Sequence, residues 1–267
     1  MLHKVRQFLA RPAGAPAAAT IPPGRRVYAV GDVHGRLDLF DRLIDAIEAD
    51  DSASAPAATT LVLLGDLIDR GPDSAAMVAR ARDLQQRRDT RILAGNHEEM
   101  FLRSLEDTET LRHFLRFGGR ETVLSYGVDP QAYAEATLEE AQALIRAAVP
   151  AEDIAFLEGL EDMVTIGDYL FVHAGIQPGV PLAEQNRTDL RWIREPFLSH
   201  AHPHERVVVH GHTITELPED RGNRIGIDTG AFMTGRLTAL RLEGASRRFL
   251  AVVEGAGGAI VAEPAEA

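Results

Sequence analysis

Three short apolar segments near the start of the chain each run into a motif that begins with glycine. They are Val27–Val30 before GDVHG (31–35), Leu61–Leu64 before GDLIDRG (65–71), and Arg91–Ala94 before GNHE (95–98). Each segment is interpreted as a buried strand. Apolar residues recur at helical spacing from Leu37, and Pro72 stands where a second helix would begin. This alternation predicts an α/β fold of parallel βαβ units, which binds ligands beyond the carboxyl ends of its strands.

The rest of the chain divides into two parts with different patterns. Residues 98–160 look mostly helical, with breaks at 118–119 and 127–130, and we interpret them as a helical insertion that could wall the site. From Met163 onward the pattern is one of short β segments separated by turn residues. These segments are Met163–Ile166, Tyr169–His173, Val207–His210, Arg224–Ile227, Leu237–Leu242 and Phe249–Val253.

Composition restricts the classes of partner. The net charge of −12 and a pI near 5.3 argue against a nucleic-acid backbone or an anionic membrane as the partner. The absence of cysteine excludes disulfides, thiolate zinc sites and cysteine nucleophiles, and it fits the cytoplasm, where we expect the protein. No run approaches the ~18 apolar residues of a membrane helix. We expect a single domain over residues 25–254, between flexible tails at 1–24 and 255–267.

The polar residues of the motifs form a set of metal ligands. Hard or borderline divalent cations prefer carboxylate, imidazole and amide oxygen, and each candidate follows an apolar strand. Asp32 and His34 lie two residues apart in extended geometry, so both can point to one side. With Asp66 they could hold one cation. A second cation could be held, with the Asp66 carboxylate bridging, by Asp66, Asn96, His173 and His212.

Such a pair of cations is suited to hydrolysing a phosphate ester. Two cations about 3.5–4 Å apart clamp the attacking and leaving oxygens of an in-line phosphoryl displacement. They also lower the pKa of water between them towards ~7, so hydroxide is available at neutral pH to attack directly. A single aspartate or histidine after a strand is more often a turn, cap or structural residue. Five motifs in order, each at a strand end, argue against that interpretation for the whole set.

At these residues the chain resembles the PPP-type metallophosphatases of the calcineurin-like superfamily. The family pattern GDxHG, GDxxDRG, GNHE, His-Ala-Gly (here 173–175) and a later histidine (here in GHT, 211–213) is complete. The segments WIRE (192–195) and IDTGA (227–231) resemble the small bacterial and phage-lambda-type serine/threonine phosphatases. The resemblance covers roughly residues 26–243. It implies a four-layer α/β/β/α metallophosphoesterase sandwich of two mixed sheets, with the metals at one edge.

The resemblance implies the same division of metal ligands and gives the other motif residues roles in the reaction. His97 would be the general acid that protonates the leaving alkoxide, and Asp69 would orient it and raise its pKa. Arg70 and Arg194 would grip the phosphate oxygens, beside Asn96. Family members usually prefer manganese, so two Mn²⁺ ions are the expected cofactors, with iron and zinc as alternatives.

Two pairs of residues compete for one role each. His210 and His212 alternate along the chain, so we expect only one of them to face the metal, and we favour His212 because it lies in the GHT motif. His210 would then be structural or support a ligand. Arg191 competes with Arg194 for the phosphate, and we favour Arg194.

Other polar residues allow a functional and a structural interpretation. Glu98 could support a ligand or be a helix-start carboxylate, and Asp228 could bond a ligand histidine or be a turn residue. Residues 118–120 could approach substrate, although helix punctuation also explains the glycines. The cluster His200, His202 and His204 is interpreted as an exposed loop rather than a metal site.

The expected activity is removal of phosphate from phosphoserine and phosphothreonine of proteins or peptides, with phosphotyrosine as a further substrate. The alternative is hydrolysis of diadenosine polyphosphates or other nucleotides at the same centre. Relatives that cleave these symmetrically typically have glutamine in the first motif, so His34 favours the protein phosphatase. A binding module without activity would require loss of a ligand or of the acid, and none is lost. The Asp69–Arg70 pair is more typical of monoesterases than of phosphodiesterases.

Overall fold

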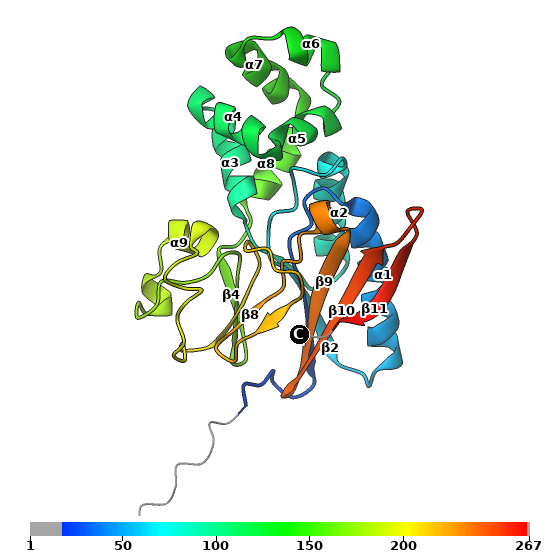
Figure 1. Ribbon diagram of the computed structural model, residues 1–267, viewed down its shortest axis with the longest axis vertical. Helices are drawn as coiled ribbons and strands as arrows, with labels where there is room; N and C mark the ends of the chain where they lie inside the picture. The colour runs from blue at the N-terminus through cyan, green and yellow to red at the C-terminus, as the bar shows by residue number, and fades with distance from the viewer. Residues whose placement is uncertain (1–17, 266–267) are drawn as a thin grey trace, which may run out of the picture.

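The computed structural model describes residues 18–265, and two mixed sheets form its centre (Figure 1). In the first sheet β1, β2 and β3 are parallel neighbours, as predicted, and β9 pairs antiparallel with β1. Strands β10 and β11 extend the sheet beyond β9. The six strands, in spatial order, are β11 (Ile260–Ala265), β10 (Ser246–Glu254), β9 (Arg236–Glu243), β1 (Arg25–Val30), β2 (Ala58–Leu63) and β3 (Thr90–Ile92).

The second sheet has five strands. Strands β5, β6 and β8 are parallel neighbours, and the antiparallel strands β4 and β7 form its two edges. In spatial order they are β4 (Met163–Ile166), β5 (Tyr169–Val172), β6 (Val207–His210), β8 (Arg224–Gly226) and β7 (Glu219–Asp220). Every strand predicted from the sequence is present, and β7, with two residues, is one that the pattern missed.

Alternation along the strands separates the apolar layers. In β1, Val27 and Ala29 face the core between the sheets, whereas Tyr28 and Val30 face the opposite side. There they pack under α1 (Leu37–Ala53) and α2 (Ser74–Arg87), which cover the outer face of the first sheet.

The outer face of the second sheet has a thinner cover. Helix α9 (Arg187–Trp192), the short 3-10 turn η2 (Leu182–Glu184) and the loops around them pack on it, with Leu190 against Leu170 and Val172. The predicted four-layer α/β/β/α sandwich is therefore confirmed, with a fourth layer built largely of loop.

The helical insertion lies between β3 and β4 and forms a separate lobe above the sheets (Figure 1). Gly118 and Gly127, at φ +107° and +80°, produce the two predicted breaks. Its elements are α3 (Asn96–Ser104), α4 (Thr108–Phe114), the irregular turn η1 (Leu115–Gly119), α5 (Arg120–Ser125), α6 (Pro130–Glu135), α7 (Leu138–Ala148) and α8 (Ala151–Glu158).

The predicted N-terminal tail is wrong for residues 18–24, while 1–17 lie outside the described residues. Ile21 is fully buried in the core between the sheets, and its backbone N–H donates to the carbonyl of Gly244. Thr20 donates both its backbone N–H and its hydroxyl to Asp168, at 2.8 and 2.9 Å. Burial of one apolar side chain, Ile21, together with these hydrogen bonds, orders a segment whose sequence resembles a proline-rich tail.

The predicted C-terminal tail is wrong for Ile260–Ala265. This segment forms β11, which pairs with the free edge of β10. An edge strand needs few buried side chains because its neighbour supplies the backbone hydrogen bonds. Val261 is accordingly 54% exposed, so the segment lacks the apolar pattern that would have predicted a strand. Within residues 18–265, no helix is long and apolar enough to span a bilayer.

Truncating Ile21 tests the docking of the N-terminal segment. We expect Ile21→Ala to lower the free energy of unfolding by about 2–5 kcal/mol, because it leaves a cavity between the sheets. Ile214→Ala, at a side chain 38% exposed, is the control and should change it by less than about 0.5 kcal/mol. Urea unfolding followed by circular dichroism measures both. Equal, small effects would show that Ile21 does not anchor the segment.

Candidate dinuclear metal centre

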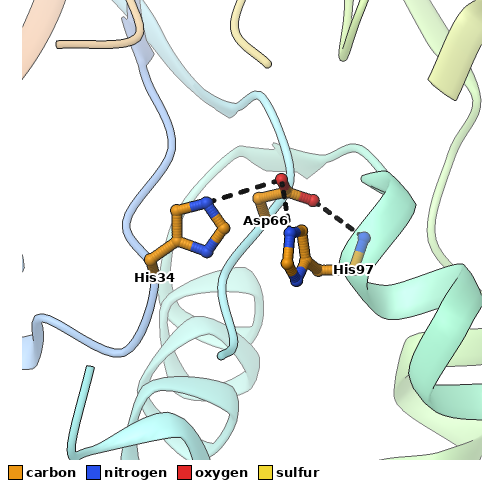
Figure 2. Close-up of side chains that lie close together, drawn as sticks. All are labelled: His34, Asp66 and His97. Atoms are coloured by element: carbon orange, nitrogen blue, oxygen red, sulfur yellow. Dashed lines mark hydrogen bonds and ion pairs between the residues drawn. The ribbon is translucent and has the colours of Figure 1, made fainter. Parts of the chain in front are cut away.

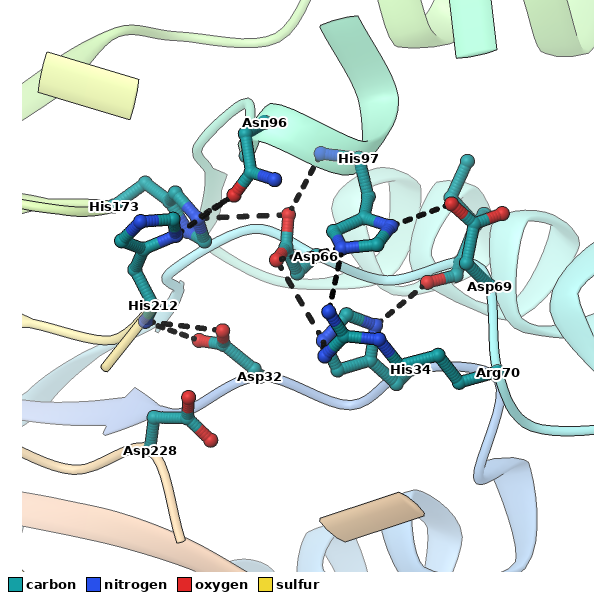
Figure 3. Close-up of polar contacts among 12 residues, drawn as sticks. Asp32, His34, Asp66, Asp69, Arg70, Asn96, His97, His173, His212 and Asp228 are labelled. Carbon is teal, nitrogen blue, oxygen red and sulfur yellow. Dashed lines mark hydrogen bonds and ion pairs between the residues drawn. The ribbon is translucent and has the colours of Figure 1, made fainter. Parts of the chain in front are cut away.

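Five loops meet at one edge of the two sheets (Figure 3). They carry Asp32 and His34 after β1, Asp66 after β2, Asn96 at the start of α3, His173 after β5 and His212 after β6. Because β1–β3 are parallel to one another, and β5 and β6 likewise, the carboxyl ends within each set lie at one edge. The structure thus brings all six predicted ligands to one place.

Asp66 lies at the centre of the six predicted ligands. Its Oδ2 is 3.6 Å from His34 Nε2 and 3.9 Å from His97 Nε2 (Figure 2), and its Oδ1 is 3.5 Å from His173 Nε2. Among residues 18–265, two groups have ligand atoms within 4.8 Å of one another: His34, Asp66 and His97, and Asp66, His173 and His212. Burial opposes ionisation of Asp66, but the surrounding imidazoles outweigh it and hold its pKa below the usual range. Asp66 is common to both groups, which is the position of a bridging carboxylate.

The hydrogen bonds of His173 leave a lone pair pointing into the second group. Its Nδ1 lies 2.8 Å from the carbonyl oxygen of Leu64, so Nδ1 carries the proton. Its Nε2 then faces Asn96 Oδ1 at 2.9 Å and Asp66 Oδ1 at 3.5 Å. His212 Nδ1 faces the same Asn96 oxygen at 2.8 Å. Imidazole nitrogens, an amide oxygen and a carboxylate oxygen that converge on one point in this way fit a cation.

Asp32 lies beside this set and outside both groups. Its carboxylate accepts the backbone N–H of His212 at 3.0 and 3.2 Å, and Asp228 is its neighbour (Figure 3). Burial, and then the carboxylates of Asp228 and Asp66, raises the pKa of Asp32 well above its usual range. A divalent cation would relieve this crowding of carboxylates, so the residues present fit the expected metals.

Arg70 joins two imidazoles of the site. Its guanidinium NH1 lies 2.7 Å from His34 Nε2, and NH2 lies 3.0 Å from His97 Nε2. Below it, the ring of Phe232 in α10 (Ala231–Thr234) lies 4.5 Å from Arg70 Cζ, a cation–π contact, and meets the His34 ring edge-on. These contacts hold the guanidinium over the centre, where a phosphate would bind.

His97 and Asp69 form a buried pair. His97 Nδ1 lies 2.5 Å from Asp69 Oδ2, and the His97 backbone N–H donates to Asp66 Oδ1 (Figure 3). Burial lowers the pKa of His97, but Asp66 and Asp69 outweigh burial and raise it above the ordinary value. Asp69 fixes Nδ1, and Nε2 faces the centre, where it accepts from the Arg70 guanidinium. A histidine held in this way can carry and give up a proton at Nε2 once a substrate oxygen takes the place of that contact.

Backbone strain is concentrated in the motifs. Of the described residues other than glycine, those with positive φ are His34 (48°), Asp66 (50°), Asp69 (73°), Arg70 (71°) and His212 (62°). Each such residue costs on the order of 1–3 kcal/mol and persists only where its surroundings hold it. All five belong to the candidate site.

Two glycines of the motifs stand where no side chain fits. A Cβ on Gly95 would lie 2.0 Å from Asp66 Oδ1, and one on Gly211 would lie 2.0 Å from Asp32 Oδ1. The backbone itself therefore packs against the carboxylates of both ligands, which explains why glycine stands at these motif positions.

Glu98 binds the backbone of two ligand-bearing loops. Its fully buried carboxylate accepts the N–H groups of Gly95, Asp66 and Leu67 at 2.7–2.9 Å. Burial, and then the charge of Asp66, raises the pKa of Glu98 to about 7. Both interpretations from the sequence therefore hold in part: Glu98 is at the start of α3 and also supports the loop of Asp66.

Replacing this carboxylate tests that support. In Glu98→Gln an amide NH₂ faces backbone N–H donors, so we expect Mn²⁺ affinity to fall about 10- to 100-fold through displacement of Asp66. Isothermal titration of the metal-stripped protein measures the affinity, with the exposed Glu106→Gln as the control. Unchanged affinity would show that Glu98 supports the helix alone.

A cavity of about 380 Å³ opens over the centre. Arg194 stands in its wall, as do Phe117 and Trp192, whose side chains are 51% and 39% exposed. Arg191 instead binds Asp162 through two nitrogens, at 2.7 and 3.1 Å. Of the two competing arginines, Arg194 is the one at the pocket.

The remaining candidates lie outside the centre. His210 is buried against Phe197, with Nε2 facing Arg224 at 3.3 Å, so its surroundings are structural. Asp228 accepts the N–H of Gly230, the bond of a turn residue, although its carboxylate faces Asp32. His200, His202 and His204 line a separate cavity of about 420 Å³.

Sequence patterns missed several residues of the site. Phe232 follows the IDTGA segment directly, a local signal that could have found it. Ser74 stands close behind the second motif, and its hydroxyl accepts the N–H of Asp69 at 3.0 Å. Thr122 also contacts Asp69, but it lies 53 residues away and no local pattern marks it. Of residues 118–120, Gly118 contacts the backbone of Arg70.

Comparison with known proteins agrees with this geometry. A sequence model of the calcineurin-like phosphoesterases matches residues 25–233. The chain is 24% identical to the asymmetrical bis(5′-nucleosyl)-tetraphosphatase PrpE of Anoxybacillus flavithermus, covering 79% of this chain and 88% of that protein. It is 28% identical to serine/threonine-protein phosphatase 1 of Salmonella typhimurium, over 82% of this chain and 93% of that protein. A crystal structure assigned to the diadenosine tetraphosphatases matches with a TM-score of 0.60 at 20% identity, over 92% of this chain and 98% of that one. The chain belongs to the calcineurin-like phosphoesterase family and is a metallophosphoesterase.

Proposed function

We propose that this protein removes phosphate from phosphoserine and phosphothreonine in proteins or peptides, and from phosphotyrosine as well. The observation that carries the proposal is that His97 lines the cavity and is joined at 2.5 Å to the buried carboxylate of Asp69. A serine or threonine alkoxide is a strongly basic leaving group, so its departure requires a proton donor. Nucleotide leaving groups are phosphates, which depart without one.

The residues of the site have separate roles in this reaction. Two divalent cations, proposed as Mn²⁺ with iron or zinc as alternatives, would neutralise phosphate charge and supply a nucleophile at neutral pH when bound. Asp32, His34 and Asp66 would hold one, and Asp66, Asn96, His173 and His212 the other. Arg70 and Arg194 would bind the equatorial phosphate oxygens, and Asn96 would lie against the substrate. His97 Nε2 would then give its proton to the leaving oxygen while Asp69 holds Nδ1.

Hydrolysis of dinucleoside polyphosphates is the second candidate. The observation in its favour is the exposed aromatic pair in the cavity wall, Phe117 and Trp192, on which a nucleobase could stack. Of the three proteins reported above, the Anoxybacillus relative and the solved structure are named for this activity, and the Salmonella relative is named for protein phosphatase activity. The two candidates differ in whether the leaving group needs the proton of His97.

Turnover of three substrates by one preparation distinguishes the candidates. Metal-stripped protein with Mn²⁺ added back would be assayed on a phosphoserine/phosphothreonine peptide, a phosphotyrosine peptide and diadenosine tetraphosphate. We expect metal-dependent phosphate release from the peptides, with kcat/KM higher than for the dinucleotide. Hydrolysis of the dinucleotide alone would overturn the proposal in favour of the second candidate.

A further inference from the structure

The helical insertion contacts two consecutive motif residues that have left-handed backbone. Asp69 and Arg70 are consecutive, and both have φ above +70°. Thr122, the third residue of α5, donates its hydroxyl to Asp69 Oδ1 at 2.6 Å and accepts the Asp69 N–H at 3.0 Å. The carbonyl of Gly118 accepts the Arg70 N–H at 3.0 Å. A lobe distant in sequence thus binds the backbone of both residues.

Besides Asp69, the Thr122 hydroxyl has one side-chain partner among the described residues, Ser74. Thr122, Asp69 and Ser74 are fully buried, and the Thr122 oxygen lies 2.9 Å from Ser74 Oγ. A hydroxyl has one proton, and the short contact to a carboxylate is the stronger bond, so that proton goes to Asp69. With Oδ1 bound by Thr122 and Oδ2 by His97 Nδ1, the plane of the Asp69 carboxylate is fixed from both sides.

We propose that Thr122 is a positioning residue for proton donation by His97, acting through Asp69. Its hydroxyl sets the orientation of the Asp69 carboxylate, which in turn aims His97 Nε2 at the leaving oxygen. The insertion is therefore part of the acid machinery as well as a wall of the cavity. This inference rests on the proposed acid role of His97.

Helix α5 offers a matched control. Ser125, one turn after Thr122, accepts the N–H of Ala75 at 3.0 Å and so also fastens α5 to α2, without contacting Asp69. Thr122→Val keeps the shape of the side chain and removes only the hydroxyl. Thr122→Ser keeps the hydroxyl. Ser125→Ala removes a fastening bond of the same helix and leaves Asp69 intact.

Kinetics on two leaving groups form the first arm of the test. We expect Thr122→Val to lower kcat on a phosphoserine peptide about 10- to 100-fold, with less loss on p-nitrophenyl phosphate and little change in KM. Thr122→Ser should restore turnover to within about twofold, and Ser125→Ala should keep the wild-type ratio of the two substrates. Equal losses on both substrates, or the same profile in Ser125→Ala, would reduce Thr122 to a structural residue and overturn the inference.

The second arm needs neither metal nor substrate. The His97 Nδ1 proton, held in a short bond to Asp69, should give a far-downfield proton NMR signal. The loss of this signal in His97→Asn assigns it. We expect the signal to shift or broaden in Thr122→Val but not in Ser125→Ala. An unchanged signal overturns the inference.

A double variant separates this inference from the proposed function. If Thr122 acts through His97, adding Thr122→Val to His97→Asn costs no further turnover of the phosphoserine peptide. Additive losses would overturn the positioning role even if the acid role holds. If His97→Asn itself shows no dependence on the leaving group, the acid role fails, and a shifted NMR signal in Thr122→Val would still report the contact with Asp69.

Discussion

His97→Asn should lower kcat on a phosphoserine peptide by about 100- to 10 000-fold, the range that a general acid contributes. The same change should cost much less on p-nitrophenyl phosphate, because p-nitrophenolate departs without a proton. Asparagine fills much of the space of the imidazole and can bond Asp69, so metal content should be retained. Steady-state kinetics on both substrates, with metal analysis of each preparation, measures these three quantities.

The control for this change lies in the same cavity. His113 also lines the pocket, but its side chain is exposed and belongs to α4, away from Asp69. His113→Asn should alter KM at most and leave the ratio of alkyl to aryl turnover unchanged. Losses of equal size on both substrates in His97→Asn would exclude the acid role and leave His97 with phosphate binding or metal support.

The strand ends of this fold were predictable because each motif is local. An apolar run that stops at Gly-Asp or Gly-Asn identifies both a buried strand and the place of its ligand, so β1, β2 and β3 and the residues after them follow from a few consecutive letters. The ligands themselves come together because parallel strands share an edge. That step needs only topology, which the alternation of strands and helices already implies.

What escaped prediction depends on contacts between distant segments. β11 exists because β10 has a free edge, a property of the neighbour and not of residues 260–265. Ile21 is fixed by a gap between two sheets whose strands come from both halves of the chain. The bond between Thr122 and Asp69 joins an insertion to a motif across 53 residues. Arg194, which the sequence favoured over Arg191, does line the pocket, but the ion pairs that hold Arg191 to Asp162 and Glu99 instead could not be foreseen.

The shared position of Asp66 makes the strongest prediction about the metals. Because Asp66 belongs to both groups of ligand atoms, Asp66→Asn should weaken both cations. The loss of affinity should exceed the roughly 10- to 100-fold typical of residues that only support a ligand. His173 belongs to one group only, so His173→Ala should release about one of the two equivalents of Mn²⁺ and leave the second equivalent bound.

Metal content after gel filtration in Mn²⁺-containing and Mn²⁺-free buffer, with isothermal titration, distinguishes these outcomes. Asp73→Asn is the control, since its exposed carboxylate lies at the start of α2 and outside both groups. Two equivalents retained by Asp66→Asn would contradict the bridging position. Loss of both metals in His173→Ala as well as in Asp66→Asn would instead show that the two sites fill together, because binding at one then depends on the other. If Asp66→Asn alone loses both metals, the carboxylate with the lowered pKa, surrounded by histidines, is the residue on which the centre depends.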